Sequence, residues 1–266
     1  MENLGQRAGE SLAAIRQKQP LIHNITNFVV MNNTANALLA CGASPVMAHA
    51  AEEVEQMVSF AGALVLNIGT LTPVWVDSML LAATKARELG VPIVLDPVGS
   101  GATDLRTQAS LRILAVGVSL VRGNASEVLS LGDAASQTKG VDSTHSVDEA
   151  AQAGMDLARS LGTPVAITGA VDLVTDGQRV LRVANGHPLM TKVTGTGCTA
   201  SALIGAFLAV DPDPVVAAAS ALAFLGLAAE KAADISKGPG SLQMNLLDVL
   251  YVLTPEELAR GARISA

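Results

Sequence analysis

Aromatic side chains are scarce in this chain, since Phe, Trp and Tyr make up only 2% of its 266 residues. Hydrophobic residues nevertheless make up 50% of the chain, so the core must be aliphatic and a disordered chain is excluded. Basic residues are also few, 17 against 24 acidic ones, which gives a formal net charge of -7. An acidic chain lacks the basic face that binds phosphate backbones, so neither nucleic acid nor an anionic membrane surface is expected as a partner.

Cysteine and long apolar segments are also limited. Cys41 and Cys198 are the two cysteines, and without a CxxC spacing we expect two free thiols rather than a disulfide or a zinc site. Residues 1–20 contain no apolar run typical of a secretory signal, which favours a cytoplasmic protein. The most apolar window, residues 215–229, is shorter than the roughly 20 residues that cross a bilayer, so it predicts a buried helix.

The order of apolar segments predicts an α/β fold. No long polar stretch is typical of a linker, so we expect a single domain over residues 1–266. Short β-branched segments alternate with longer amphipathic ones, as in a parallel sheet with helices on both faces, a three-layer αβα arrangement with a mostly parallel central sheet. The predicted strands are 21–25, 44–47, 63–67, 92–96, 120–122 and 164–168, and the predicted helices are 29–41, 73–89, 105–116, 125–131 and 147–161.

The pattern changes after residue 168. Residues 172–175 and 179–184 flank the turn dipeptide Asp176-Gly177, which predicts a hairpin and an antiparallel end to the sheet. From residue 197 onward the sequence is helical, interrupted at residues 211–214.

Two glycines precede the first of these late helices, in the run VTGTGCTAS at residues 193–201. Glycine allows close backbone approach, and the free N–H groups of a helix start attract an anion, so a transferred phosphate suits this place. The alternative is a plain tight turn into a helix. The run lacks the Gly-Lys-Ser/Thr of a P-loop, and no GxGxxG follows the first strand, so neither a P-loop NTPase nor a nicotinamide dehydrogenase is supported.

The thiol of Cys198 falls in the first turn of that predicted helix. A helix N-terminus lowers the pKa of a thiol, so we expect Cys198 to be functional. The alternative is a small buried hydrophobe, which is the interpretation we give to Cys41 at the end of an apolar helix.

Two carboxylates lie just past predicted strands, where ligands of open parallel sheets bind. Asp96 ends one strand and Glu127 follows another, and together they suit Mg²⁺ beside nucleotide phosphates. The alternatives are a cap or turn at Asp96 and a capping box between Asn124 and Glu127. Arg122 suits phosphate charge, its alternative being a surface salt bridge.

These residues belong to a longer series of matching stretches. With them, the chain resembles the hydroxyethylthiazole kinase family from residue 20 to about residue 240. The stretches that carry the resemblance are His23–Asn27, Ala43–Met47, Leu66–Leu71, Leu95–Gly99, Arg122–Glu127, Lys139–Asp142, Ile167–Gly169 and Thr191–Cys198.

The resemblance implies a ribokinase-like fold and an enzyme of thiamine biosynthesis. It implies transfer of the ATP γ-phosphate, with Mg²⁺, to the hydroxyl of 4-methyl-5-(2-hydroxyethyl)thiazole, in a homotrimer whose sites lie between subunits. Position by position, it places Asn27, Met47 and Gly195 at the thiazole, Arg122 and Thr168 at ATP, Asp96 and Glu127 at the metal and phosphates, and Cys198 at the acceptor hydroxyl. Because aromatic residues are scarce, we expect Met47 and Gly195 rather than an aromatic cage to recognise the thiazole.

Position 198 departs from the wider ribokinase-like pattern, in which Asp is usual and serves as a general base. Positioning and charge neutralisation carry most of a phosphoryl transfer, so we expect Cys198 to help without being indispensable. The alternatives are a hydroxymethylpyrimidine or sugar kinase, an ATP-dependent dehydratase on the same scaffold, and a non-catalytic nucleotide-binding regulator.

Overall fold

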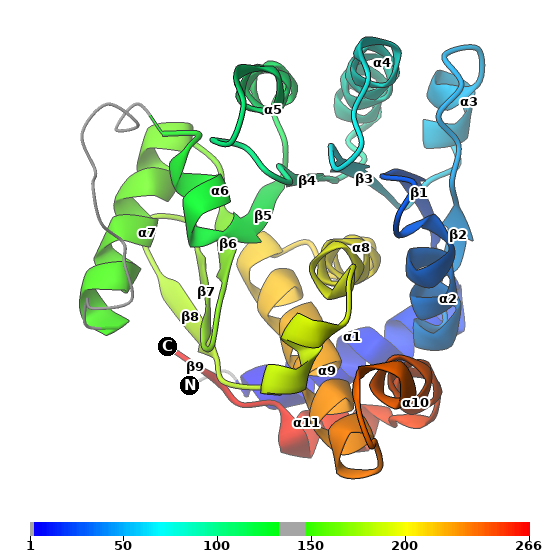
Figure 1. Cartoon of the computed structure of the whole chain (residues 1–266), viewed down its shortest axis with the longest axis vertical. Helices are drawn as coiled ribbons and strands as arrows, with labels where there is room; N and C mark the ends of the chain where they lie inside the picture. The colour runs from blue at the N-terminus through cyan, green and yellow to red at the C-terminus, as the bar shows by residue number, and fades with distance from the viewer. Residues whose placement is uncertain (1–2, 133–146) are drawn as a thin grey trace.

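A nine-stranded sheet runs through the part of the chain that the computed structural model describes, residues 3–132 and 147–266 (Figure 1). Its strand order is β2-β1-β3-β4-β5-β6-β7-β8-β9. The first six strands in this order are parallel and the last three are added antiparallel. The strands are β1 Leu21–Ile25, β2 Ser44–Val46, β3 Ala63–Asn67, β4 Ile93–Asp96, β5 Leu120–Asn124, β6 Val165–Thr168, β7 Asp172–Thr175, β8 Val180–Val183 and β9 Ile264–Ser265.

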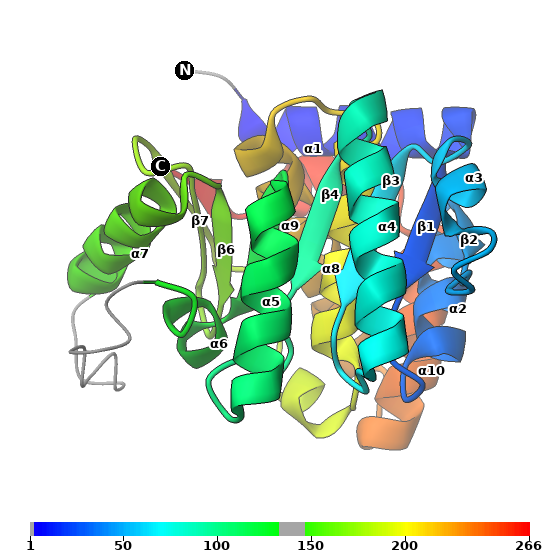
Figure 2. The same ribbon diagram turned by 90° about the horizontal axis from the view of Figure 1, so that it is seen from above.

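Helices cover both faces of this sheet, as Figures 1 and 2 show. One face carries α3 Val54–Val58, α4 Pro73–Leu89, α5 Asp104–Val116, α6 Ala125–Leu129 and α7 Val147–Leu161. The other carries α1 Leu4–Lys18, α2 Met31–Cys41, α8 Thr196–Leu208, α9 Pro214–Asp234, α10 Pro239–Val252 and α11 Pro255–Gly261, with the 3-10 helix η2 Pro188–Lys192 before α8. The predicted three-layer αβα arrangement is therefore confirmed.

Burial on both faces explains the continuous apolar strands. All five residues of β3 and all four of β4 are buried, as expected for central parallel strands. The side chains form two aliphatic clusters, one on each face of the sheet. Phe207 and Phe224 contact each other with tilted rings and a centroid distance of 5.9 Å inside the cluster of α8 and α9, and the other buried members of that cluster are aliphatic except for Cys41.

The predicted buried helix at residues 215–229 lies within α9. Among the described residues, α9 is the one helix long and apolar enough to cross a membrane, and 89% of its apolar window is buried inside the protein. Its neighbours α1, α8 and α10 cover it, so it forms a core helix, as predicted.

The elements that were not predicted include α1, α3, η2 and β9. Helix α1 carries Leu4, Ala8, Leu12 and Ile15 at helical spacing, and Asn3 caps its first turn. Helix α3 has only five residues and β9 only two, too short for a periodic signal. The predicted hairpin is formed by β7 and β8. The quoted stretch Lys139–Asp142 lies outside the described residues.

The parallel strands place their carboxyl ends at one edge of the sheet. In Figure 2 this is the lower edge, where α8 begins and η2 lies, while both chain termini lie at the opposite side. The ends of β1, β3, β4, β5 and β6 therefore face the start of α8, which is where ligands bind in such sheets.

Candidate active site

Side chains from three neighbouring strands form a buried polar chain at this edge. Asn67 ends β3 and is paired in register with Asp96, which ends β4. Asn27, just after β1, donates from Nδ2 to Asn67 Oδ1 at 2.8 Å, and Asn67 donates from Nδ2 to Asp96 Oδ2 at 2.7 Å. Asn67 was not predicted as a site residue, although its place at the end of a buried strand was the same signal that selected Asp96.

Asp96 is fully buried, with 0% of its surface exposed. Ser201 of α8 donates to Asp96 Oδ2 at 2.8 Å, and Arg122 Nη1 lies 3.9 Å from the same oxygen. Burial raises the pKa of Asp96, and the nearby Arg122 charge opposes that rise. The other oxygen, Asp96 Oδ1, has no hydrogen-bond partner among the described residues, so it is left to accept from a ligand.

Cys198 joins the same network from the first turn of α8. Its Sγ accepts from Asn67 Nδ2 at 3.2 Å and from Asn27 Nδ2 at 3.5 Å. The expected lowering of its pKa is wrong: burial and the charge of Asp96 raise the pKa of Cys198 to about 11, against the two amide donors. Loss of hydration at the buried sulfur therefore outweighs the helix dipole, and the thiol is neutral near pH 7.

The second cysteine has the structural role predicted for it. Cys41 is fully buried in the core, and burial raises the pKa of its thiol to about 12.

The start of α8 is open to an anion. Gly195 is the N-cap residue with φ of 82°, in the left-handed region, and no side chain caps the first amides. A Cβ at Gly195 would lie 2.7 Å from Val30 Cγ1, and one at Gly197 would lie 2.7 Å from Arg122 Nη1. The glycines thus make the tight turn and also admit the Arg122 guanidinium against the helix start, while phosphate binding at this start stays a prediction.

Arg122 in β5 and Thr168 at the end of β6 lie side by side. Arg122 Nη2 donates to Thr168 Oγ1 at 2.7 Å, and the Arg122 side chain is only 11% exposed. Its Nε has no partner among the described residues. A surface salt bridge is therefore the wrong interpretation of Arg122, because its side chain is largely buried and the carboxylate it faces, Asp96, is buried as well.

Glu127 forms the capping box that was the alternative to its metal role. Its Oε2 accepts from the amide of Asn124 at 2.9 Å, while Asn124 Oδ1 accepts from the amide of Glu127 at 2.9 Å. Its Oε1 accepts from the amide of Gly99, also at 2.9 Å. Each carboxylate oxygen keeps a lone pair, so metal binding by Glu127 stays a prediction.

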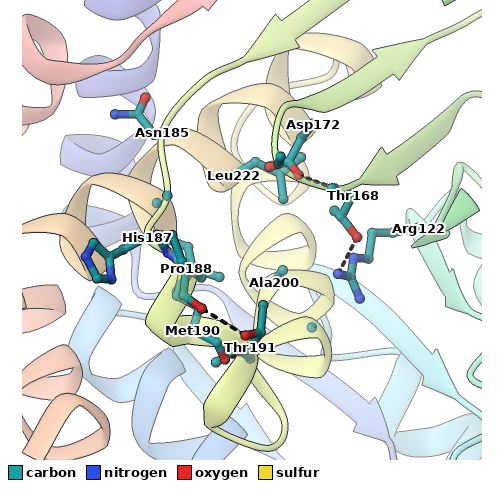
Figure 3. Close-up of a pocket in the computed structure, with 17 residues that line it drawn as sticks. Arg122, Thr168, Asp172, Asn185, His187, Pro188, Met190, Thr191, Ala200 and Leu222 are labelled. Atoms are coloured by element: carbon teal, nitrogen blue, oxygen red, sulfur yellow. Dashed lines mark hydrogen bonds between the residues drawn. The ribbon is translucent and has the colours of Figure 1, made fainter. Parts of the chain in front are cut away.

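A cavity of about 580 Å³ opens beside Arg122 (Figure 3). Arg122, Thr168 and Asp172 line one side of it, and Asn185 and Met190 line the opposite side. The start of α8 and the α9 residues Leu222, Leu225 and Gly226 also line it. Its volume suits a nucleotide-sized ligand.

Asp172 is the most unusual ionisable group of this cavity. Burial raises its pKa to about 6, although Asp172 Oδ1 accepts from the amide of Gly169 at 3.0 Å and the Arg122 charge also lowers the pKa. Asp172 was predicted only as part of a hairpin strand and not as a site residue.

The three residues predicted for the acceptor substrate lie outside this cavity's lining. Asn27 is in the polar network, Gly195 begins α8, and Met47 is half-buried just after β2. His23, buried in β1, donates from Nε2 to the carbonyl of Ala48 at 2.8 Å and so fixes the chain beside Met47.

Three of the few rings in the chain lie beside these segments. Trp75 contacts Phe28 at a centroid distance of 4.8 Å and His49 at 4.4 Å. Phe28 follows Asn27 directly and is 64% exposed, and His49 is two residues after Met47. An aromatic cluster therefore lies beside the residues predicted to bind the acceptor substrate, although the low aromatic content of the chain did not predict one.

The residues expected to hold Mg²⁺ fit that ion in one respect. The described part of the chain contains no group of three or more His, Cys, Asp or Glu side chains that would form a closed metal site. Mg²⁺ beside a nucleotide needs only one or two carboxylates together with phosphate oxygens and water. The unpartnered Oδ1 of Asp96 meets that need.

The chain is similar in sequence and in structure to known proteins. The model of the "Hydroxyethylthiazole kinase family" matches residues 12–256. A hydroxyethylthiazole kinase from Desulfotalea psychrophila is 61% identical over 265 residues, covering 99% of this chain and 97% of the relative. The structure of a hydroxyethylthiazole kinase from Pyrococcus horikoshii OT3 is 50% identical with a TM-score of 0.90, covering 97% of this chain and 98% of the other.

A more distant structure bears on the fold alone. A ribokinase-like superfamily protein from Enterococcus faecalis is 13% identical with a TM-score of 0.61, over 86% of each chain. The predicted ribokinase-like fold is thereby confirmed.

Proposed function

This chain belongs to the hydroxyethylthiazole kinase family, and we propose that it transfers the γ-phosphate of ATP to the hydroxyl of 4-methyl-5-(2-hydroxyethyl)thiazole. The observation that carries the proposal is the meeting of two sites at the start of α8. On one side lies the cavity with Arg122 and Thr168, and on the other the network of Asn27, Asn67 and Cys198.

We assign the nucleotide to the cavity, with its terminal phosphates toward Arg122 and α8. The first amides of α8 and the guanidinium of Arg122 supply positive potential in a buried setting, where it acts strongly on developing phosphate charge. Thr168 holds Arg122 in place by accepting from its Nη2.

On the acceptor side, Asn27, Met47 and Gly195 are proposed to contact the thiazole, with its hydroxyl directed at Cys198. The Sγ atom of a neutral thiol is a weak proton acceptor. Cys198 therefore orients the substrate hydroxyl more than it removes the proton of that hydroxyl. Asp96 and Glu127 are proposed to hold Mg²⁺, which when bound supplies charge neutralisation to the phosphates.

Three further properties belong to the same proposal. We propose that the enzyme acts as a single domain in the cytoplasm, and that it forms a homotrimer with its sites between subunits. The exposed Phe28 and Val29, both 64% accessible beside Asn27, are consistent with a neighbouring subunit at this face. Native mass spectrometry tests the trimer, which a monomer at micromolar concentration would contradict.

The test of function is a product assay. The protein is incubated with Mg-ATP and the thiazole alcohol, and the phosphomonoester is sought by mass spectrometry, with Arg122→Ala as the control for site location. We expect the phosphorylated thiazole from the wild type and at least about 100-fold less from Arg122→Ala. ATP binding without product would favour another acceptor or a regulator, and ADP release without a phosphorylated product would favour a dehydratase.

A further inference from the structure

One wall of the cavity is a loop, residues 184–187, that follows β8 and leads to η2. Two segments far away in the sequence hold this loop, α9 and the last residues of the chain. Figure 3 shows Asn185 and His187 of the loop opposite Asp172 and Thr168.

Helix α9 supports the loop through Glu230 and Gly226. Glu230 Oε1 accepts from the amide of Gly186 at 2.7 Å and from Asn185 Nδ2 at 3.4 Å. A Cβ at Gly226 would lie 2.6 Å from the Asn185 carbonyl carbon, so the loop backbone lies directly on α9.

The chain terminus holds the same loop from its other side. Asn185 is only 5% exposed, and both ends of its amide bond the terminus: Nδ2 donates to the carbonyl of Gly261 at 3.1 Å, and Oδ1 accepts from the amide of Arg263 at 2.7 Å. The amide of Ala184 donates to the carbonyl of Arg263 at 3.0 Å. A wall residue of the cavity is thus satisfied by groups 76 and 78 residues away.

The guanidinium of Arg263 joins the two supports. Its Nη2 donates to the carbonyl of Ala184 at 2.6 Å and to Glu230 Oε1 at 2.5 Å, and its Nη1 donates to Glu230 Oε2 at 3.0 Å. Partial burial favours the neutral form of Glu230, but the bonds from Arg263 and Gly186 hold the pKa of Glu230 below its usual value. The carboxylate is therefore ionised and binds both the loop and the terminus.

We infer that Arg263 is a positioning residue for nucleotide binding, which fixes the 184–187 wall of the cavity through Ala184 and Glu230. The inference rests on the proposed function in assigning ATP to this cavity. Arg263 does not line the cavity, so its effect is indirect. A loop held in place before ATP arrives loses little conformational freedom on binding, whereas a loosened loop must be ordered at the expense of affinity.

The test measures ATP binding to the full chain by isothermal titration calorimetry, with Mg-ATP and no thiazole. We expect Arg263→Ala to weaken ATP binding about five- to tenfold and Arg263→Lys to restore part of the loss. The matched control is Arg260→Ala, which removes the same charge from the same segment at an exposed residue. At saturating ATP, the KM for the thiazole in Arg263→Ala should stay within about twofold of the wild type.

Hydrogen exchange gives a readout that does not depend on activity. The peptide containing Gly186 should exchange faster in Arg263→Ala than in Arg260→Ala, because the amide of Gly186 donates to Glu230. Equal ATP affinity of the two alanine variants, or an equal loss of ATP and thiazole affinity in Arg263→Ala, would overturn the inference. A wild-type chain that binds no ATP would overturn the proposed function itself, and the inference with it.

Discussion

Cys198 shows how burial can reverse an expectation based on position. A thiol in the first turn of a helix is normally acidified by the free amides there. In this protein the sulfur is buried beside the Asp96 carboxylate, and both effects favour the neutral thiol. Asn27 and Asn67 nevertheless direct amide hydrogens at Sγ, so the sulfur is held in a defined place.

The first prediction concerns this thiol. Because so little of it is ionised near pH 7, Cys198→Ala should lower kcat only about tenfold, and Cys198→Asp should remain active because a carboxylate accepts the same proton. Steady-state kinetics measures both, with Cys41→Ala as the control that removes a buried thiol far from the site. A folded Cys198→Asp variant without activity would exclude a proton acceptor at this position.

A second prediction tests the amide that joins Asp96 to Cys198. Asn67→Asp keeps the size of the side chain but removes the Nδ2 donor and adds a negative charge beside Asp96. We expect kcat to fall about 100-fold or more, with a smaller change in the KM for ATP. Asn36→Asp makes the same substitution at an exposed position of α2 and should be neutral. Unchanged kcat in Asn67→Asp would show that the network is not needed for catalysis.

At the scale of the element, α8 is suited to the proposed phosphate position because no side chain caps its first turn. Its N-cap Gly195 turns the chain with a positive φ, and Gly197 leaves room for Arg122. From Thr199 to Leu208 every residue of the helix is buried, so the core fixes its position rigidly. Because the buried residues fix the rest of the helix, its N-terminus can stay ordered without a side-chain cap.

The third prediction separates backbone strain from crowding at this turn. Gly195→Ala adds a Cβ in the left-handed region and against Val30, and should destabilise the protein by about 1–3 kcal/mol and raise the KM for the thiazole. Gly90→Ala, at φ of 70° with nothing within 4 Å of its Cβ, carries the strain alone. Thermal unfolding and kinetics compare the two. Equal effects on stability and no change in KM would show that Gly195 does not shape the acceptor pocket.

At the scale of the whole molecule, an acidic chain binds an anionic nucleotide by collecting positive potential in one place. The net charge is -7, yet Arg122 and the start of α8 lie together at the cavity. Asp172 adds a partly buried carboxyl group to the same cavity, and its raised pKa makes the stability of the molecule depend on pH.

The fourth prediction follows from that carboxyl group. Burial raises the pKa of Asp172 in the folded chain to about 6, whereas the ordinary pKa of an Asp side chain is 3.8. Between these values the folded chain binds more protons, so raising the pH through this window lowers the free energy of unfolding, on the order of 2 kcal/mol for this group. Asp172→Asn should remove this contribution and raise the melting temperature more at pH 7.5 than at pH 4.5. The exposed Asp248→Asn is the control, and a pH-independent effect of Asp172→Asn would contradict the raised pKa.

The sequence by itself determined the layers and most of the site's residues. Alternating apolar segments specified a parallel sheet covered on both faces, and ligands of such sheets bind past the strand ends, so Asp96, Arg122 and Glu127 could be selected from the sequence pattern. Thr168 came only from the family resemblance. The tertiary structure alone decided their partners and their chemistry. Hydrogen bonds between strands distant in sequence identified Asn67 as a member of the polar network. Loss of hydration raised the pKa values of Cys198 and Asp172. Arg263, near the chain terminus, supports the loop that forms one wall of the cavity. These hydrogen bonds and pKa values depend on which groups the folded chain brings together and shields from water. A local pattern of residues does not contain that information.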